Sequence, residues 1–296
     1  PLLLYFGDLD RNGSLDVLRA QRDARVDRIY PLEPLPRLLG AMPFLGQRVS
    51  SFSAFASAGV QELFGAALTS AVRLVADTYE HTLFLNRGDH FEAVALPLEA
   101  QLAPAFYAGI ADFDGDGHED VFLSQNFYPT EIGTPRYDAG RGLWLRGDGA
   151  GGLSAVPGQE SGIDVYGDGR GAALGDFDGD GRIDLAVAQN GAATRLFRNV
   201  RGAPGLRVRL AGPPGNPYGI GARVNLILAG GAGDGPVREI AAGSGYWSVD
   251  GAVQVLGGVA LAEAVRVRWP GGRETRVPIP EGAIEVTVRY GSEQSR

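Results

Sequence analysis

The sequence predicts an all-β protein, and two observations support this class. The 296 residues include 45 Gly and 18 Pro, and 44% of them are hydrophobic. This composition is too apolar for a disordered chain and rich in residues that form turns. In addition, an acidic stretch of nine residues occurs three times, each time beside short apolar runs. Together these features indicate many short strands, built from a repeated unit, rather than long helices.

The repeated stretch reads DFDGDGRID at residues 176–184, DFDGDGHED at residues 112–120 and DLDRNGSLD at residues 8–16. Oxygen-bearing side chains at positions 1, 3, 5 and 9, with a backbone carbonyl at position 7, suit a hard cation that takes about six to eight oxygen ligands. Gly181 permits the sharp turn that a side chain would obstruct. The pattern therefore predicts a calcium loop that leads into a strand.

The predicted ligands follow the same spacing in each copy, and Ser14, His118 and Arg182 are expected to contribute only a backbone carbonyl. The full set is Asp8, Asp10, Asn12, Ser14 and Asp16; Asp112, Asp114, Asp116, His118 and Asp120; and Asp176, Asp178, Asp180, Arg182 and Asp184. Calcium is favoured over magnesium because one flexible loop supplies many oxygens. We expect up to three structural calcium ions. The alternative is a set of Gly/Asp turns without ions, in which clustered carboxylates would repel one another.

Charge and residue usage exclude several classes of function. The formal net charge is -8, and no basic surface stands out, so nucleic acid is not an expected partner. The chain has no cysteine, which excludes disulfides and thiolate chemistry. It also has no apolar run of about 18 residues, so no transmembrane span is predicted. The opening run PLLLYF is interpreted as a strand of a processed or trimmed chain rather than as a signal peptide.

Short strands are predicted along most of the chain, with a different composition between residues 21 and 80. Residues 21 to about 50 are expected to form an irregular connection. Residues 51–77 carry apolar side chains at mostly three- and four-residue spacings, which predicts one or two amphipathic helices with Ser50 or Ser51 as N-cap. We expect this helical insert to cover a sheet edge, and a docking helix for a partner is the alternative. Strands are predicted at residues 2–6, 15–18, 81–86, 91–96, 107–111, 121–124, 143–145, 153–156 and 193–197.

The runs AGIADFDGDGHEDVFLSQN and AALGDFDGDGRIDLAVAQN resemble the FG-GAP or VCBS repeats of integrin-type β-propellers. The runs TLFLNRGDHFEAV, LWLRGDGAGGLSAV and RLFRNVRG are similar to the outer strand and turn of the same repeats. The resemblance implies a partial β-propeller over residues 1–202, with a helical or irregular insert at about 21–80. Three loops are too few for a closed seven-bladed ring of four-stranded blades. We therefore expect either that N-terminal blades are missing or that a partner or the insert completes the propeller.

Residues 205–296 resemble the ASPIC/UnbV domain of proteins related to cartilage acidic protein. The resemblance depends on GIGARV at residues 219–224, GSGY at 243–246 and VRVRWPGG at 265–272. Apolar alternation in this region predicts a small β-sandwich or barrel. After GSGY the chain reads SVDGAVQVLGGVA, where the family continues toward an FGLG segment, so no family role is carried over to that loop.

Other motifs have simpler interpretations. The RGD triplets at residues 87–89 and 146–148 are interpreted as turns between strands, with an integrin ligand as the alternative. The histidines His81, His90 and His118 are scattered in the sequence and have no catalytic neighbour. The Gly-rich stretches lack the Gly-Lys-Ser/Thr of a phosphate loop. Tyr246 and Trp247 are expected to pack within the C-terminal domain, and an exposed aromatic contact is the alternative.

The sequence therefore predicts a non-enzymatic calcium-binding scaffold or recognition module with a protein partner and an extracytoplasmic location, whether periplasmic, cell-surface or secreted. We find no nucleophile–base pair, histidine ligand set or cofactor loop, so no catalytic or cofactor-binding residue is predicted. One alternative is a peripheral subunit of a larger membrane-associated complex, docked through residues 21–77 or the open propeller edge. A second alternative is a propeller enzyme or an accessory protein of a biosynthetic pathway.

Overall fold

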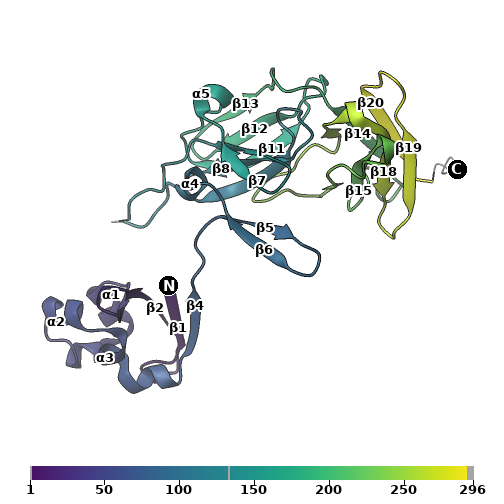
Figure 1. Cartoon of the computed structure of the whole chain (residues 1–296). Helices are drawn as coiled ribbons and strands as arrows, with labels where there is room; N and C mark the ends of the chain where they lie inside the picture. The colour runs from purple at the N-terminus through teal and green to yellow at the C-terminus, as the bar shows by residue number, and fades with distance from the viewer. Residues whose placement is uncertain (1, 133, 292–296) are drawn as a thin grey trace. The chain divides into compact units, whose positions relative to one another are not determined.

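The computed structural model describes residues 2–132 and 134–291, which divide into two compact units, Pro1–Glu80 and His81–Arg296 (Figure 1). Strands dominate both units and form small sheets of two to four strands. The predicted all-β class is thus confirmed. In the described part of the chain, no helix is long and apolar enough to cross a membrane.

The first unit combines a four-stranded antiparallel sheet with short helices. The sheet has the order β3-β2-β1-β4, and the helices follow one another between β3 and β4. Its hydrophobic core joins side chains of the sheet, such as Leu3 and Leu18, to helical side chains such as Leu38 and Phe64. The elements are β1 (Leu2–Gly7), β2 (Asp16–Asp23), β3 (Arg28–Pro31), α1 (Leu35–Ala41), η1 (Pro43–Gln47), α2 (Phe52–Ser57), α3 (Val60–Phe64), η2 (Gly65–Thr69) and β4 (Val72–Ala76).

Two details of the predicted insert are wrong. The expected irregular connection contains β3, which pairs with the end of β2. The expected amphipathic helix breaks at Gly65, which follows α3 and has a φ of 53°, a positive value that glycine adopts without steric cost. The chain then forms β4, which pairs antiparallel with β1, because its β-branched residues fit a strand and β1 offers an edge. Ser51 does cap α2, since its hydroxyl accepts a hydrogen bond from the Ala54 amide at 3.1 Å.

The second unit begins with a hairpin and two sheets that carry the acidic loops. The hairpin consists of β5 (Thr82–Asn86) and β6 (Phe91–Ala95), followed by α4 (Leu98–Gln101). The first sheet has the order β10-β9-β8-β7, and the second has the order β11-β12-β13. All of these strand pairs are antiparallel, and every predicted strand in this region is present. The strands are β7 (Ala105–Ala111), β8 (Asp120–Gln125), β9 (Leu143–Gly147), β10 (Leu153–Ala155), β11 (Gly169–Gly175), β12 (Asp184–Gln189) and β13 (Ala192–Phe197), with α5 (Gly158–Ser161) after β10.

The rest of the second unit is a C-terminal domain in which two sheets share one core. The sheets have the orders β17-β14-β20 and β16-β15-β18-β19, and both contribute to the buried cluster around Val208, Val224 and Trp269. This arrangement agrees with the predicted small β-domain. The elements are β14 (Leu206–Ala211), β15 (Arg223–Leu228), η3 (Ala229–Gly231), β16 (Arg238–Glu239), β17 (Gln254–Leu256), η4 (Val259–Leu261), β18 (Ala262–Arg268), β19 (Glu274–Pro278) and β20 (Glu285–Arg289).

Candidate metal sites

Each acidic stretch joins two antiparallel neighbouring strands, and this explains why its two ends meet. The first loop connects β1 to β2, the second connects β7 to β8, and the third connects β11 to β12. The residue before position 1 pairs across the sheet with the aspartate at position 9 in each case, as in Gly175 with Asp184. Strand pairing therefore fixes the distance between the first and last carboxylates of each loop.

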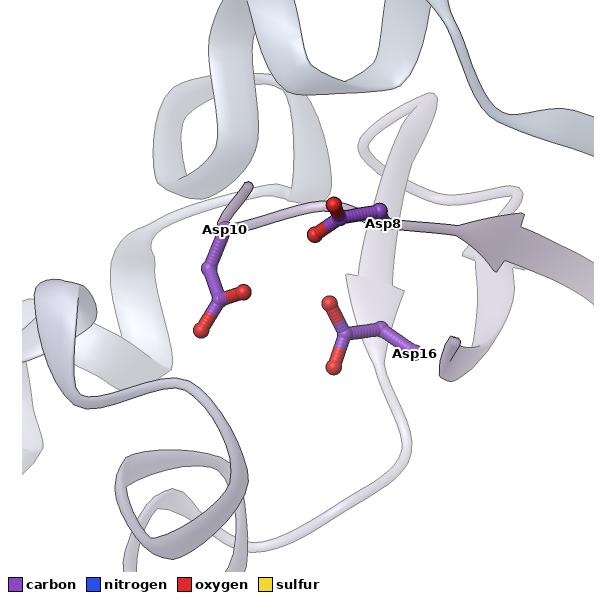
Figure 2. Close-up of side chains that lie close together, drawn as sticks. All are labelled: Asp8, Asp10 and Asp16. Atoms are coloured by element: carbon purple, nitrogen blue, oxygen red, sulfur yellow. The ribbon is translucent and has the colours of Figure 1, made fainter. Parts of the chain in front are cut away.

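The aspartates at positions 1, 3 and 9 converge in all three loops. One carboxylate oxygen from each of the three lies within 4.8 Å of the others. Figure 2 shows the first of these clusters, in which the three carboxylates face one another. The clusters are Asp8, Asp10 and Asp16; Asp112, Asp114 and Asp120; and Asp176, Asp178 and Asp184.

The same hydrogen bonds hold each loop in shape. The carboxylate at position 1 accepts from the amides at positions 5 and 6; in the second loop, Asp112 accepts from Asp116 at 3.1 Å and from Gly117 at 2.8 Å. The carboxylate at position 9 accepts from the amide at position 2, at distances of 2.9 to 3.0 Å. Because three segments with different sequences share this pattern, the repeat predicted from the sequence is also a structural repeat.

Backbone conformation separates the first loop from the other two. Gly115 and Gly179 at position 4 have left-handed φ values of 80° and 79°, which glycine adopts without steric cost. The first loop has Arg11 at this position, with a φ of 63°. A side chain in this conformation costs about 1–2 kcal/mol, so the first loop is the most strained of the three.

The side chains at position 5 lie outside the three-carboxylate clusters. Asn12, Asp116 and Asp180 each accept a hydrogen bond from the amide at position 7, at 2.7, 2.8 and 3.0 Å. At position 7, the His118 ring lies against the Gly149 backbone, and the Arg182 guanidinium pairs with Asp180 at 3.0 Å. The side chains of His118 and Arg182 thus have neighbours other than the clustered carboxylates, and the use of carbonyl groups at this position stays a prediction.

Burial disfavours the ionised form of several carboxylates in the second and third clusters. Burial raises the pKa of Asp120 to about 6, although the amides of Gly147 and Phe113 donate hydrogen bonds to its carboxylate. Burial also raises the pKa of Asp112 and Asp184. A bound divalent cation reverses such shifts because it favours the ionised carboxylate.

The donor sets fit calcium. All the clustered side-chain donors are carboxylate oxygens, which are the ligands that hard cations prefer. An ion that holds its ligands at about 2.3–2.6 Å accommodates oxygens up to about 5 Å apart, and the observed limit of 4.8 Å falls within this range. The aspartates at positions 1, 3 and 9 would hold the ion.

Arginines neutralise the third loop more than the second. In the second loop, Arg146 pairs with Asp114 at 2.8 Å. In the third loop, Arg207 pairs with Asp176, Arg198 pairs with Asp178, and Arg182 pairs with Asp180. This difference in local charge predicts that the second loop attracts a divalent cation more strongly than the third.

Other predicted motifs do not form a site. Both RGD triplets lie where two neighbouring strands are joined. In the first, the Arg87 amide donates to the His90 carbonyl at 2.9 Å; in the second, Asp148 accepts from the amides of Ala150 and Gly152, which lowers its pKa. The described residues place none of the three histidines in a metal-binding cluster.

A cavity of about 530 Å³ lies between the two loop-bearing sheets of the second unit. Its walls include Phe122, Trp144 and Phe197. Among the described residues, the lining includes Asp114 of the second loop but no carboxylate of the third. The cavity therefore does not join the two acidic clusters into one site.

The predicted packing of Tyr246 and Trp247 within the C-terminal domain is wrong. Trp247 is 85% exposed, and its ring stacks on Tyr246, with centroids 5.2 Å apart. Tyr246 in turn contacts Phe106 of β7, at 5.6 Å between centroids. Ser248 fixes this turn because its hydroxyl accepts a hydrogen bond from the Ala172 amide of β11 at 3.0 Å.

Several residues that join the C-terminal domain to the loop-bearing sheets could not be recognised from the sequence. Arg238 pairs with Glu119 beside the second loop at 2.8 Å. Asp250 accepts hydrogen bonds from the Tyr107 hydroxyl at 2.7 Å and from the Leu174 amide at 2.9 Å. In the sequence these residues resemble ordinary polar positions of strands and turns, so their role depends on contacts between distant segments.

Comparison with known proteins supports part of the sequence analysis. Residues 212–295 match the family model described as ASPIC and UnbV. The chain is 26% identical over 211 residues to cartilage acidic protein 1 of Homo sapiens, which covers 69% of this chain and 31% of that protein. It is 28% identical over 212 residues to cartilage acidic protein 1 of Xenopus tropicalis, covering 69% and 32%. The chain spans about a third of the length of these curated relatives. The predicted resemblance of the C-terminal domain to the ASPIC and UnbV family is therefore confirmed, together with a more distant similarity of the chain to cartilage acidic protein 1.

Proposed function

We propose that this protein is a non-enzymatic, calcium-stabilised scaffold that presents a recognition surface to a protein partner. The observation that carries the proposal is the recurrence of one carboxylate cluster, with one hydrogen-bond pattern, in three loops. A single acidic turn would be weak support. Three equivalent clusters between paired strands favour a structural role that each repeat needs in order to fold.

Calcium would stabilise the loops by compensating their buried negative charge. Asp112, Asp120 and Asp184 are all less than a tenth exposed, and a buried carboxylate is stable as an ion only when it is paired or bound to a metal. Sites of this type in extracellular modules bind calcium at about 10⁻⁴–10⁻³ M. This range supports an extracytoplasmic location, whether periplasmic, cell-surface or secreted.

We further propose that the loop-bearing sheets are blades of a partial FG-GAP/VCBS propeller. In both sheets the first two strands in chain order, β7 with β8 and β11 with β12, are neighbours joined by an acidic loop, which supports one repeated blade. The second of these sheets has one strand fewer than the first. A partner or a further segment of chain would supply the missing outer strand.

The recognition surface that we favour includes Trp247. Its exposed ring lies on a turn held by Ser248, and aromatic side chains are enriched in the central parts of protein interfaces. Trp247 also has a φ of 51°, and a backbone conformation of this kind is found at functional sites more often than elsewhere.

Membrane-complex association is a second candidate, supported by β4. Val72, Leu74 and Val75 of this edge strand are each about half exposed, and an exposed apolar edge favours association with another surface. Co-sedimentation of the protein with membranes, abolished by Leu74→Glu, would support this function. Recovery of all the protein in the supernatant would reject it.

Calorimetric titration with calcium tests the main proposal. The wild-type chain is expected to bind up to three ions, and a variant with alanine at position 3 of every loop is expected to bind none. A control that removes three exposed aspartates keeps the same net charge as this variant and is expected to bind like the wild type. The variant carries Asp10→Ala, Asp114→Ala and Asp178→Ala, and the control carries Asp89→Ala, Asp138→Ala and Asp164→Ala. Equal heats of calcium binding for the wild type, the variant and the control would reject specific calcium binding at the loops.

A further inference from the structure

We propose that the second and third acidic loops are the docking surface for the C-terminal domain, so that cation binding and docking of this domain are thermodynamically linked. The inference rests on the proposed function, because it needs a cation at the loops. It adds a role for the ion in coupling two domains. The contacts that carry it come from both loops.

At the third loop, the C-terminal domain contacts both backbone and side chain. The Gly181 carbonyl accepts a hydrogen bond from the Gly205 amide at 2.8 Å. Arg207, at the start of β14, pairs with the carboxylate of Asp176, and the two side chains are 13% and 0% exposed. Asp176 occupies position 1, so the domain holds one of the predicted ligands directly.

The second loop likewise has one backbone contact and one contact with the carboxylate at position 1. The Asp114 carbonyl accepts a hydrogen bond at 2.8 Å from the amide of Ala203, in the segment that leads from β13 into the C-terminal domain. Gly257 lies so close to Asp112 that an added Cβ would be 1.7 Å from its Oδ2 atom. Asp112 also occupies position 1. The C-terminal domain therefore meets the equivalent ligand in both loops.

A partly buried ion pair reinforces the docking at the second loop. Arg238 of β16 donates to Glu119 from Nε at 3.0 Å and from Nη2 at 2.8 Å. The two side chains are 10% and 25% exposed. A two-point contact of this kind fixes orientation as well as distance. Glu119 immediately precedes the ligand Asp120, so the pair is sensitive to the position of the loop.

These contacts require ordered loops. Without a cation, the carboxylates at positions 1, 3 and 9 repel one another, and the carbonyls of Asp114 and Gly181 lose their fixed positions. With a cation, the loop backbone is preorganised for the amides of Ala203 and Gly205. Linkage is reciprocal, so docking must raise the affinity of the second loop for the cation by the same factor by which a cation in that loop favours docking.

Hydrogen exchange of the full chain, in excess calcium and in chelator, tests the linkage. Chelation is expected to accelerate exchange at the Ala203 and Gly205 amides by at least tenfold. Amides in the β15–β18 ladder report on folding of the C-terminal domain itself, and their exchange is expected to stay unchanged. If the loop amides of Gly117 and Gly181 respond to calcium while Ala203 and Gly205 do not, the linkage is wrong and calcium binding stands. If none of these amides responds, calcium binding at these loops is wrong as well.

A charge-neutral pair of substitutions tests reciprocity. Glu119→Gln with Arg238→Met removes this partly buried pair without changing the net charge near the second loop. The calcium concentration that half-protects the Gly117 amide is expected to rise about fivefold, at the lower end of typical coupling between sites. The matched control is Glu239→Gln with Arg223→Met, which removes an exposed pair of the same type and is expected to leave that concentration unchanged. An equal response in the two double variants would overturn the proposal.

Discussion

The guanidinium of Arg238 donates two hydrogen bonds to Glu119, although the two residues are 119 positions apart in the chain. Glu119 precedes the last ligand of the second loop, and Arg238 belongs to the C-terminal domain. This pair therefore connects the metal-binding part of the second unit with the part that resembles the ASPIC and UnbV family.

Removal of the Asp120 side chain should destabilise the second unit even without calcium. Asp120 is fully buried and accepts hydrogen bonds from the amides of Gly147 at 2.8 Å and Phe113 at 3.0 Å. Each amide left unpaired costs about 1–3 kcal/mol, so Asp120→Ala should lower the free energy of unfolding by about 2–5 kcal/mol. Urea denaturation measures this change. Asp89→Ala, at an exposed turn, serves as control, and equal midpoints for the two variants would contradict the account.

In calcium-free buffer, the pH dependence of the free energy of unfolding should show the titration of the Asp120 carboxyl. Burial raises the pKa of Asp120 to about 6 from an ordinary value of 3.8. Between these values the folded state binds more protons than the unfolded state, so this group makes stability fall as the pH rises from about 4 to 6. Asp120→Asn should remove this component. Urea midpoints across the range measure it, and parallel curves for the wild type and Asp120→Asn would show that Asp120 does not titrate in this way.

Gly115→Ala should destabilise the protein more than a comparable change at a free turn. Gly115 has a φ of 80°, and an added Cβ would be 2.3 Å from the Ala203 carbonyl oxygen. Gly88 has a φ of 96° but nothing within 4 Å, so Gly88→Ala measures the conformational cost alone, about 1–2 kcal/mol. The clash should add about 1–3 kcal/mol at Gly115. Thermal unfolding of both variants gives the difference, and equal losses would mean that residue 203 does not pack against the loop.

Trp247→Ala should weaken binding of the proposed protein partner without changing the free energy of unfolding. Its side chain is 85% exposed, and substitutions at such surfaces alter stability by less than about 0.5 kcal/mol. The variant should also lose the part of the tryptophan fluorescence that acrylamide quenches most readily, because Trp269 is buried and Trp144 is partly buried. If quenching of the variant equals that of the wild type, Trp247 is not exposed in solution.

The acidic loops could be predicted from the sequence because their geometry is local. Nine residues and one strand pair determine where positions 1, 3 and 9 meet. A glycine at position 6 of every loop, and at position 4 of the second and third, gives the turn its shape. The strands around them were predicted for the same reason, since short apolar alternation and flanking turns lie close together in the chain.

The remaining features depend on contacts between distant segments. Val72 and Val75 have helical spacing, yet they belong to β4, because β1 provides an edge for pairing. Trp247 is exposed because Ser248 is tied to β11, which lies more than 70 positions earlier. Arg207 and Arg238 look like surface residues of alternating strands, and only the structure brings them to Asp176 and Glu119.

Thermal unfolding in calcium and in chelator tests the central claim most directly. For a site with a dissociation constant of about 10⁻⁴ M, about 10 mM calcium is 100 times that constant and stabilises the folded state by about 2.7 kcal/mol. Calcium at about 10 mM should therefore raise the melting temperature by several degrees. Magnesium at the same concentration should raise it much less. An identical melting temperature in calcium and in chelator would contradict the proposal that calcium stabilises this fold.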